Sequence, residues 1–167
     1  MENNEIKVSV IMPIYNAYAY LRPAMDSVLD QTLREIEIIC VDDGSTDKSL
    51  AILKEYQKQD DRVRIITETN AGPGMARNKG ISRARGEYIA FLDADDFYEP
   101  TFIEALYTAS KRDSLDIAIS KYDLYNTRKA RFEPAAHADH SGVFLPGKVT
   151  SRGEYPDIIL SSTVGSA

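Results

Sequence analysis

The chain has 167 residues, of which 43% are hydrophobic and 28% charged, enough for a substantial core and one ordinary globular domain. Its formal net charge of -6 argues against a surface that neutralises nucleic-acid phosphates or coats an anionic membrane. The single cysteine, Cys40, excludes an intrachain disulfide and reads as a small core residue. No signal peptide or bilayer-spanning apolar stretch is present. We therefore expect a cytoplasmic chain, with a peripheral position at the inner membrane face left open for a longer protein.

Short β-rich runs alternate with stretches whose apolar residues recur at helical spacing. This alternation predicts an α/β fold with a parallel sheet and crossover helices that pack on it. The predicted strands are Ile6–Met12, Ile36–Val41, Val63–Thr67, Tyr88–Leu92 and Asp116–Ser120. Capping side chains at Ser45–Asp47 and a proline at Pro73 mark the expected starts of two helices.

Polar loops follow three of these strands, at Pro13–Asn16, Asp42–Ser45 and Asp93–Asp96. In open α/β sheets, ligands bind beyond the carboxyl ends of the strands, so these loops should share one crevice. Periodicity weakens after Tyr122, where proline and glycine recur. We therefore predict a core over residues 1–122 and an irregular extension over 123–167.

That extension offers little that can be assigned to chemistry. A short helix is expected around Glu154–Leu160. His137 and His140 lie close together, but two histidines without a third ligand are usually polar loop residues, so we reject a structural zinc site.

Several carboxylates emerge together after the strand at Tyr88–Leu92, namely Asp93, Asp95 and Asp96. Their repulsion can be compensated by a divalent cation, because hard oxygen ligands suit magnesium or manganese and the ion can also hold a diphosphate. The alternative is a solvated acidic turn that caps the next helix. The second carboxylate pair, at the end of another strand, favours the ligand site.

Asp42 and Asp43 form that pair and can accept hydrogen bonds from a nucleobase or a ribose. Their alternative role is a turn and helix cap. Tyr15 can offer an aromatic face to a base, or can simply pack. These readings make nucleotide recognition the preferred function of the loops.

The segment Asn70–Gly80 is a glycine-containing approach to a helix that carries basic side chains. Gly72 and Gly74 permit close backbone approach, and Arg77 or Lys79 can offset the charge of a ligand. Asn70, Gly72 and Arg77 are therefore candidate contacts to a nucleotide. The spacing matches neither a P-loop nor the dinucleotide fingerprint, which weakens those classes.

Four motifs in order closely resemble glycosyltransferase family 2: Val8–Asn16, Val41–Asp47, Ala76–Gly80 and Gly86–Asp96. The resemblance covers about the first two-thirds of the chain. It implies a GT-A-type, Rossmann-like, mainly parallel sheet flanked by helices. It also implies transfer of a hexosyl or N-acetylhexosaminyl group, with inversion, from a nucleotide-diphosphate sugar to a hydroxyl of a carbohydrate or glycolipid. The resemblance favours uridine diphosphate as the nucleotide of the donor.

By the same resemblance, Pro13 and Tyr15 look like nucleotide contacts of the first strand, and Asp43 with Asp42 resembles the acidic nucleoside contact. Asp93-Ala94-Asp95 resembles the Asp-X-Asp metal motif. Asp95 is then the strongest candidate ligand for manganese or magnesium, with Asp93 as the second, and Asp93 also helps to orient the donor ribose or sugar in the site.

The family's acceptor-side base belongs to a Glu-Asp pair further downstream, and no Glu-Asp dipeptide follows Asp96. Glu154 and Asp157 fit a helix cap or a solvated surface better, so the base stays unassigned. We expect the chain to stop before the acceptor region. Two alternatives remain open: a noncatalytic nucleotide-sugar-binding module, and, with less support, another magnesium-dependent nucleotidyl or phosphoryl enzyme.

Overall fold

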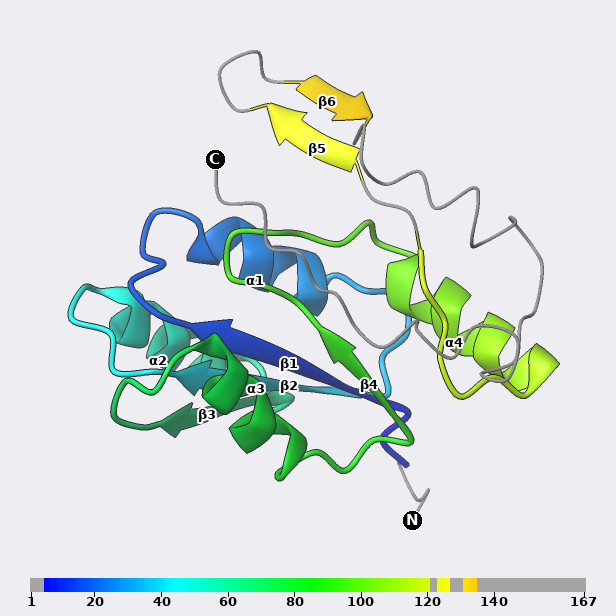
Figure 1. Cartoon of the computed structure of the whole chain (residues 1–167), viewed down its shortest axis with the longest axis horizontal. Helices are drawn as coiled ribbons and strands as arrows, with labels where there is room; N and C mark the ends of the chain where they lie inside the picture. Colours follow the sequence, from blue (N-terminus) through cyan, green and yellow to red (C-terminus); the bar gives the residue numbers. More distant parts are fainter. Residues whose placement is uncertain (1–4, 121–122, 127–130, 135–167) are drawn as a thin grey trace. The chain divides into compact units, whose positions relative to one another are not determined.

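A computed structural model describes residues 5–120, 123–126 and 131–134 of the chain (Figure 1). The chain divides into two compact units, residues 1–109 and residues 110–167. The first unit holds a four-stranded sheet with its covering helices, and the second holds a short hairpin.

The sheet of the first unit is entirely parallel. β1 (Val8–Ile14) pairs with β2 (Ile36–Asp42) on one side and with β4 (Tyr88–Phe91) on the other, and β3 (Val63–Thr67) completes the order β3-β2-β1-β4. β2 is buried along its whole length, as expected for a central strand with both faces covered. The predicted α/β fold with a mainly parallel sheet is confirmed.

Helices cover both faces of this sheet. α1 (Leu21–Leu29) and α2 (Ser49–Gln59) pack on one face, and α3 (Pro73–Ile81) packs on the other, against β1 and β2 (Figure 1). In the first turn of α4 (Phe102–Asp113), Ile103 is buried in the same core as α1 and α2. The strands therefore run between helical layers, and their carboxyl ends open toward one edge.

The helix starts agree in part with the sequence signals. Pro73 occupies the first turn of α3, as predicted. α2 begins at Ser49, whose N–H donates to Asp47 Oδ1 at 2.8 Å. The predicted cap at Ser45–Asp47 therefore acts partly on the helix, and its other contacts join the loop that follows β1.

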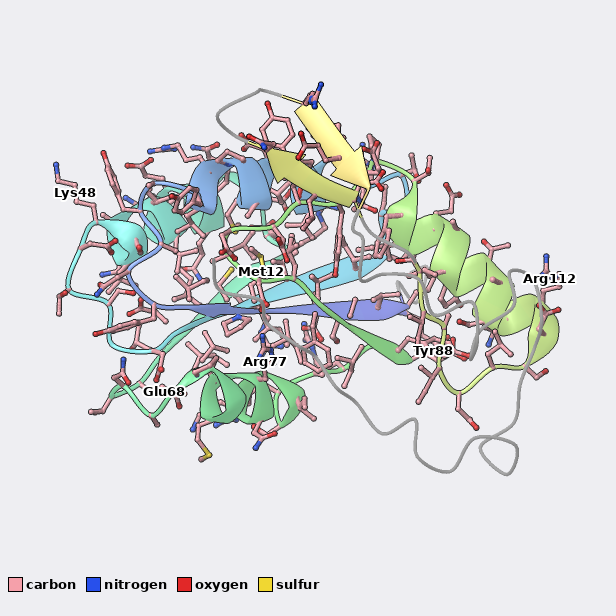
Figure 2. All side chains as sticks on the ribbon, turned by 45° about the horizontal axis from the view of Figure 1, so that its top comes forward. Met12, Lys48, Glu68, Arg77, Tyr88 and Arg112 are labelled. Atoms are coloured by element: carbon pink, nitrogen blue, oxygen red, sulfur yellow. The ribbon has the colours of Figure 1, made fainter. Side chains whose placement is uncertain are left out.

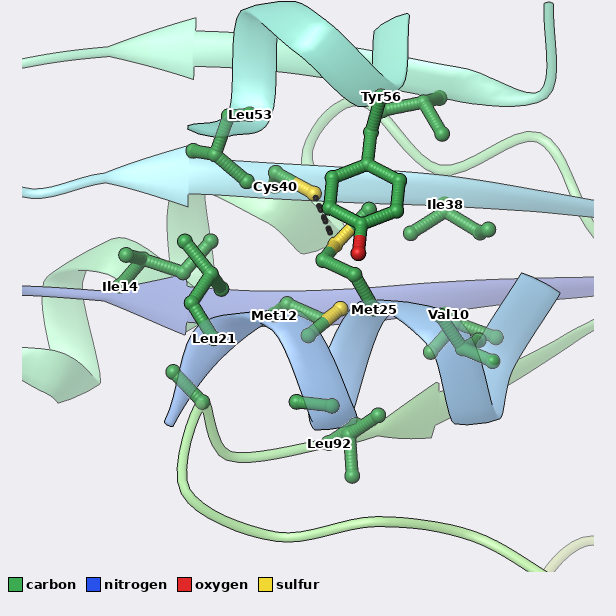
Figure 3. Close-up of a cluster of buried hydrophobic side chains, with 14 of the residues drawn as sticks. Val10, Met12, Ile14, Leu21, Met25, Ile38, Cys40, Leu53, Tyr56 and Leu92 are labelled. Atoms are coloured by element: carbon green, nitrogen blue, oxygen red, sulfur yellow. Dashed lines mark hydrogen bonds between the residues drawn. The ribbon is translucent and has the colours of Figure 1, made fainter. Parts of the chain in front are cut away.

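The main core lies between the sheet and the layer of α1 and α2 (Figure 3). Alternate residues of β1 and β2 point into it, as the period of a strand requires. The Cys40 thiol donates a weak hydrogen bond to Met25 Sδ at 3.7 Å, and burial raises the pKa of that thiol to about 12. Cys40 is thus the inert core residue that the sequence predicted. The largest side chains buried here include Met12, Ile14, Leu21, Met25, Ile38, Leu53 and Leu92.

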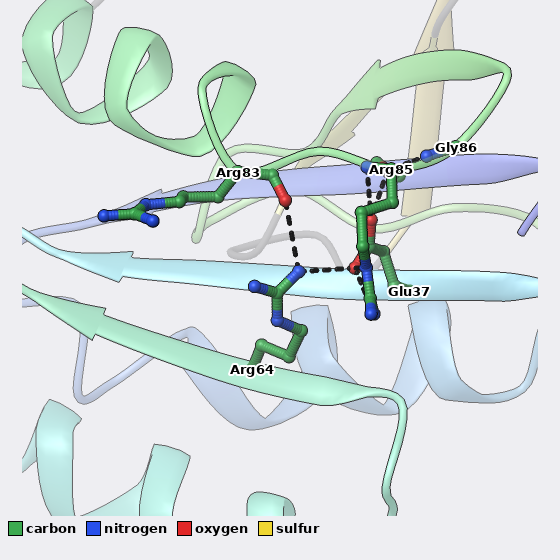
Figure 4. Close-up of polar contacts among 6 residues, drawn as sticks. Glu37, Arg64, Arg83, Arg85 and Gly86 are labelled. Atoms are coloured by element: carbon green, nitrogen blue, oxygen red, sulfur yellow. Dashed lines mark hydrogen bonds and ion pairs between the residues drawn. The ribbon is translucent and has the colours of Figure 1, made fainter.

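The other face of the sheet carries a buried carboxylate near the amino ends of the strands. Glu37 is only 2% exposed. It accepts hydrogen bonds from Ser9 Oγ at 2.7 Å, Arg64 Nη1 at 2.7 Å and Arg85 Nη2 at 2.9 Å (Figure 4). The backbone N–H of Arg85 also donates to it at 2.7 Å. We call these four residues the Glu37 cluster; it joins β1, β2, β3 and the segment that leads into β4.

In the Glu37 cluster, hydrogen-bond partners offset the cost of burying the carboxylate. Burial alone raises the pKa of Glu37, but the hydrogen bonds from Ser9, Arg64 and Arg85 outweigh it and hold that pKa below its ordinary value. The chain passes tightly beside the cluster at Gly86, where an added Cβ would lie 2.5 Å from the Ser9 backbone nitrogen. A glycine is therefore required at this position.

The predicted fifth strand, Asp116–Ser120, is wrong. These residues form no strand, and Ile117 and Ile119 are 67% and 59% exposed. Alternating apolar residues predict a strand only if a neighbouring strand supplies hydrogen bonds, and no strand among the described residues pairs with this segment.

The second unit contains an antiparallel hairpin that the sequence did not predict. β5 (Asp123–Asn126) pairs with β6 (Arg131–Pro134), and the rings of Tyr125 and Phe132 lie 5.1 Å apart. The predicted helix at Glu154–Leu160, both histidines and Asp157 lie outside the described residues. Within the described part of the chain, no helix is both long and apolar enough to cross a bilayer.

Candidate functional site

The loop after β1 is tied to the loop after β2. Asn16 adopts a left-handed backbone conformation (φ 50°), and its Oδ1 accepts hydrogen bonds from the Thr46 N–H at 2.8 Å and the Asp47 N–H at 3.3 Å. In return, the Asn16 N–H donates to Ser45 Oγ at 3.0 Å, and the Tyr18 N–H donates to Asp47 Oδ2 at 3.0 Å. The two loops therefore form one frame at the carboxyl edge of the sheet.

Asp43 joins this edge to the loop between β3 and α3. It is 2% exposed, and its two carboxylate oxygens accept the backbone N–H groups of Ala71 at 2.8 Å and Gly72 at 2.9 Å. Gly72 has a φ of 89°, a conformation that favours glycine. The carboxylate thus fixes the glycine-containing loop, and each oxygen keeps a further lone pair.

Asp42, the last residue of β2, is also buried, at 3% exposed. Its Oδ1 has no hydrogen-bond partner among the described residues. A buried polar atom without a partner destabilises a fold by about 1–3 kcal/mol, so an acceptor left in this state at the carboxyl edge is a candidate ligand contact.

The acidic loop after β4, residues 92–98, alternates between the core and the solvent. Leu92 and Ala94 are buried in the main core at 1% and 7% exposed, whereas Asp95 and Asp96 are exposed. A hydrogen bond from the Asp96 N–H to the Asp93 carbonyl, at 3.0 Å, closes the turn. The apolar residues therefore anchor the loop and leave its carboxylates at the surface.

One cationic side chain pairs with a carboxylate of the acidic loop. Arg77 reaches from α3 toward the sheet (Figure 2), and its Nη2 lies 2.6 Å from Asp93 Oδ1. Among the described residues, no cationic side chain forms an ion pair with Asp95 or Asp96. Burial, and then the charges of Asp95 and Asp93, raise the pKa of Asp96 above its ordinary value. The acidic loop is therefore an under-compensated negative site.

Tyr98 ends the acidic loop and was not singled out by its sequence. Its hydroxyl donates to the Phe91 carbonyl at 2.5 Å, and its ring stacks on Phe102 with 4.3 Å between centroids. Burial, together with the charges of Asp93 and Asp96, raises the pKa of Tyr98, so the hydroxyl stays protonated and donates.

Two uncharged side chains in and just after α1 hold the segment that follows the acidic loop. Gln31, fully buried, donates from Nε2 to the Glu99 carbonyl at 2.7 Å and accepts the Ile103 N–H at 2.9 Å. Ser27 Oγ accepts the Tyr98 N–H at 3.2 Å. Polar residues beside an apolar helical stripe were the only sequence signal for this bracing.

The predicted site residues therefore meet in two pairings. Asp43 contacts the loop that carries Asn70 and Gly72, and Arg77 contacts Asp93. Tyr15 lies directly after β1 and is 52% exposed, while Pro13 lies within β1 opposite Val41. No hydrogen bond of the described residues joins the side chain of Tyr15 to the other candidates.

Known proteins are similar to this chain in sequence and in fold. Residues 9–161 match the family model described as Glycosyl transferase family 2. The chain belongs to glycosyltransferase family 2. Its relatives in this family include the glycosyltransferase GlyA of Streptococcus pneumoniae, 41% identical over 126 residues, and the uncharacterized glycosyltransferase YibD of Escherichia coli, 47% identical over 118 residues. These matches cover 75% and 71% of this chain.

A solved structure supports the GT-A-type fold of this family 2 chain. Staphylococcus aureus TarS 1–349 in complex with UDP-GlcNAc is similar with a TM-score of 0.60 and 33% identity, over 64% of this chain and 31% of that chain. The chain spans only 18% of the length of GlyA and 34% of that of YibD. The family and fold are thus established for this chain, while its substrates are a matter of proposal.

Proposed function

We propose that this chain is the donor side of a glycosyltransferase that binds a nucleotide-diphosphate sugar, with uridine diphosphate as the nucleotide. The observation that carries the proposal is the carboxyl edge of the sheet. There Asp43 braces the β3–α3 loop, and Arg77 of the following helix meets Asp93 of the acidic loop. Ligands of open α/β sheets bind at this edge. The donor-binding core proposed here comprises residues 1–122.

Around the nucleoside, the proposed contacts are small in number and come from three loops. The unpaired Asp42 Oδ1 supplies an acceptor for an N–H of the base, and the exposed ring of Tyr15 supplies a face for stacking. Asp43 acts indirectly, because its carboxylate holds the β3–α3 loop that carries other proposed contacts. The remaining proposed nucleotide contacts are Pro13, Asn70 and Gly72.

Around the diphosphate, we assign Asp95 and Asp93 to a divalent cation. Carboxylate oxygens suit manganese or magnesium, and the excess negative charge of the acidic loop fits a cation. The described residues contain no group of three or more side chains arranged to hold a metal by themselves. This sparse set suits an ion that takes further ligands from a diphosphate. When bound, such an ion stabilises negative charge on the leaving diphosphate.

Transfer with inversion requires the acceptor hydroxyl, on a carbohydrate or glycolipid, to approach from the face opposite the diphosphate. A carboxylate base must take its proton. We assign no base among the described residues. The second candidate function is a noncatalytic module that binds a nucleotide sugar without turnover.

Calorimetric titration with UDP and UDP-GlcNAc, with and without Mn²⁺, tests the donor site. We expect Mn²⁺ to tighten UDP binding at least about tenfold, which corresponds to about 1.4 kcal/mol. Asp95→Asn should remove that gain. Asp61→Asn, which changes an exposed aspartate in the turn before β3, should preserve it. A folded wild-type chain that binds neither ligand would contradict the proposal, and release of UDP from UDP-GlcNAc would separate turnover from binding.

A further inference from the structure

The acidic loop is held in place mainly by uncharged contacts. Apart from the Arg77–Asp93 pair, its fixed points are the Tyr98 hydroxyl on the Phe91 carbonyl and the Tyr98 N–H on Ser27 Oγ. Leu92 and Ala94 anchor it further in the core. Neutral contacts restrain the backbone while the carboxylates keep their charge.

We propose that Tyr98 is a positioning residue, whose hydroxyl closes the acidic loop and sets its carboxylates for a divalent cation and a nucleotide diphosphate. The inference rests on the proposed function for its ligand, and on geometry for the loop. Phe91 is the last residue of β4, so the 2.5 Å hydrogen bond joins the entry of the loop to its exit and encloses Asp93, Asp95 and Asp96.

The hydroxyl can hold the loop because the rest of Tyr98 is fixed. Its ring stacks on Phe102 at an interplanar angle of 20° and packs against the main core. Next to it, the Glu99 carbonyl accepts a hydrogen bond from the fully buried Gln31. Helices α1 and α4 thus determine where the hydroxyl lies, and the hydroxyl determines how far the loop can spread.

Charge explains why a hydroxyl suits this position. Three carboxylates within four residues repel one another and favour an open loop. An arginine or lysine at the exit would hold the loop but would also neutralise the carboxylates that a cation needs. A neutral O–H donor opposes the spreading and leaves the negative potential intact.

Removal of the hydroxyl is the direct test. Tyr98→Phe keeps the stacked ring and loses one hydrogen bond, so we expect Mn²⁺-dependent UDP affinity to fall about three- to tenfold, the range of one net hydrogen bond. Tyr56→Phe is the matched control. It removes a comparable tyrosine hydrogen bond, to Asp26 Oδ1 at 2.6 Å, between α2 and α1. That control should lower stability by a similar amount and leave UDP affinity unchanged.

A second measurement does not depend on the donor. Hydrogen–deuterium exchange in the ligand-free chain should become faster over residues 92–98 in Tyr98→Phe, with no such change in Tyr56→Phe. Unchanged exchange over these residues would overturn the inference. Faster exchange with unchanged UDP affinity would also overturn it, because the loop would then be held for stability alone.

The two proposals can fail separately. If the wild-type chain binds no UDP while exchange responds to Tyr98→Phe as expected, the loop-closing role stands and the donor assignment fails. If UDP binds with Mn²⁺ but neither measurement responds to Tyr98→Phe, the donor assignment stands and the role of Tyr98 fails.

Discussion

Glu37 and Asp95 are both carboxylates of the first unit, but the fold surrounds them in opposite ways. Glu37, near the amino end of β2, is 2% exposed and is met by two guanidinium groups, a hydroxyl and a backbone N–H. Asp95 follows the carboxyl end of β4, is exposed, and lies beside Asp93 and Asp96. Among the residues that the structure describes, Arg77 is the only cation paired to this group.

The difference separates a carboxylate that serves the fold from one that we propose to bind a ligand. A buried charge is tolerated when its hydrogen bonds are satisfied, as in the Glu37 cluster. A crowded group of carboxylates with too few partners is unfavourable for the isolated fold, and such strain collects at functional sites. Proximity of acidic residues in the sequence does not distinguish the two cases; their partners in space do.

The largest effect expected from this comparison is on stability, at Glu37. Glu37→Gln removes the negative charge that two arginines share, and we expect the free energy of unfolding to fall by about 2–3 kcal/mol. This is less than for a fully buried pair, because Arg64 and Arg85 keep access to solvent. Urea unfolding of both proteins measures the loss.

The pH dependence of the free energy of unfolding provides the check on this prediction. The folded-state pKa of Glu37 lies below its ordinary value of 4.5, so its contribution is present above that pH and is lost as pH falls through the folded pKa. The stability difference between wild type and Glu37→Gln should therefore be full at pH 7 and shrink below about pH 4.5. Glu55→Gln, in the exposed pair with Arg22, is the matched control. Equal losses in both variants would remove the contrast drawn here.

At the functional edge, Arg77 should affect binding more than stability. Arg77→Gln breaks a partly exposed ion pair, so the free energy of unfolding should fall by no more than about 1 kcal/mol. UDP affinity in the presence of Mn²⁺ should fall about tenfold, or about 1.4 kcal/mol, because Asp93 loses its partner and the diphosphate loses a nearby cation. Calorimetry measures the affinity. Arg22→Gln should leave it unchanged, and an equal loss there would indicate a general charge effect.

The sequence predicted the parts of the fold that depend on local pattern. Strands β1 to β4 were visible because continuous apolar runs alternate with helical stripes, and Pro73 marked the start of α3. The segment at Asp116–Ser120 had the same kind of pattern but pairs with no described strand. Pattern therefore indicates which segments can form strands, while pairing decides which ones do.

The candidate site was predictable at the level of which loops converge, since parallel strands bring their carboxyl ends to one edge. The contacts were less so. Asp43 was predicted as a nucleoside contact, yet its oxygens hold backbone N–H groups at Ala71 and Gly72, 28 and 29 positions away. Glu37 was hidden in an apolar run, and Tyr98 carries no charge that would draw attention to it. These roles arise from distances that only the folded chain defines.

The smallest effect expected, and the one of opposite sign, is at Asp96. Its raised pKa means that partial desolvation of the carboxyl group, and the charges of Asp95 and Asp93, make its ionised form unfavourable in the folded chain. At neutral pH, Asp96→Asn should therefore increase the free energy of unfolding, by no more than about 1 kcal/mol because the residue is exposed. Asp61→Asn should give no such gain in the same urea titration. A loss of stability at Asp96 would instead identify its carboxylate as a structural acceptor, and the acidic loop would then resemble the Glu37 cluster rather than oppose it.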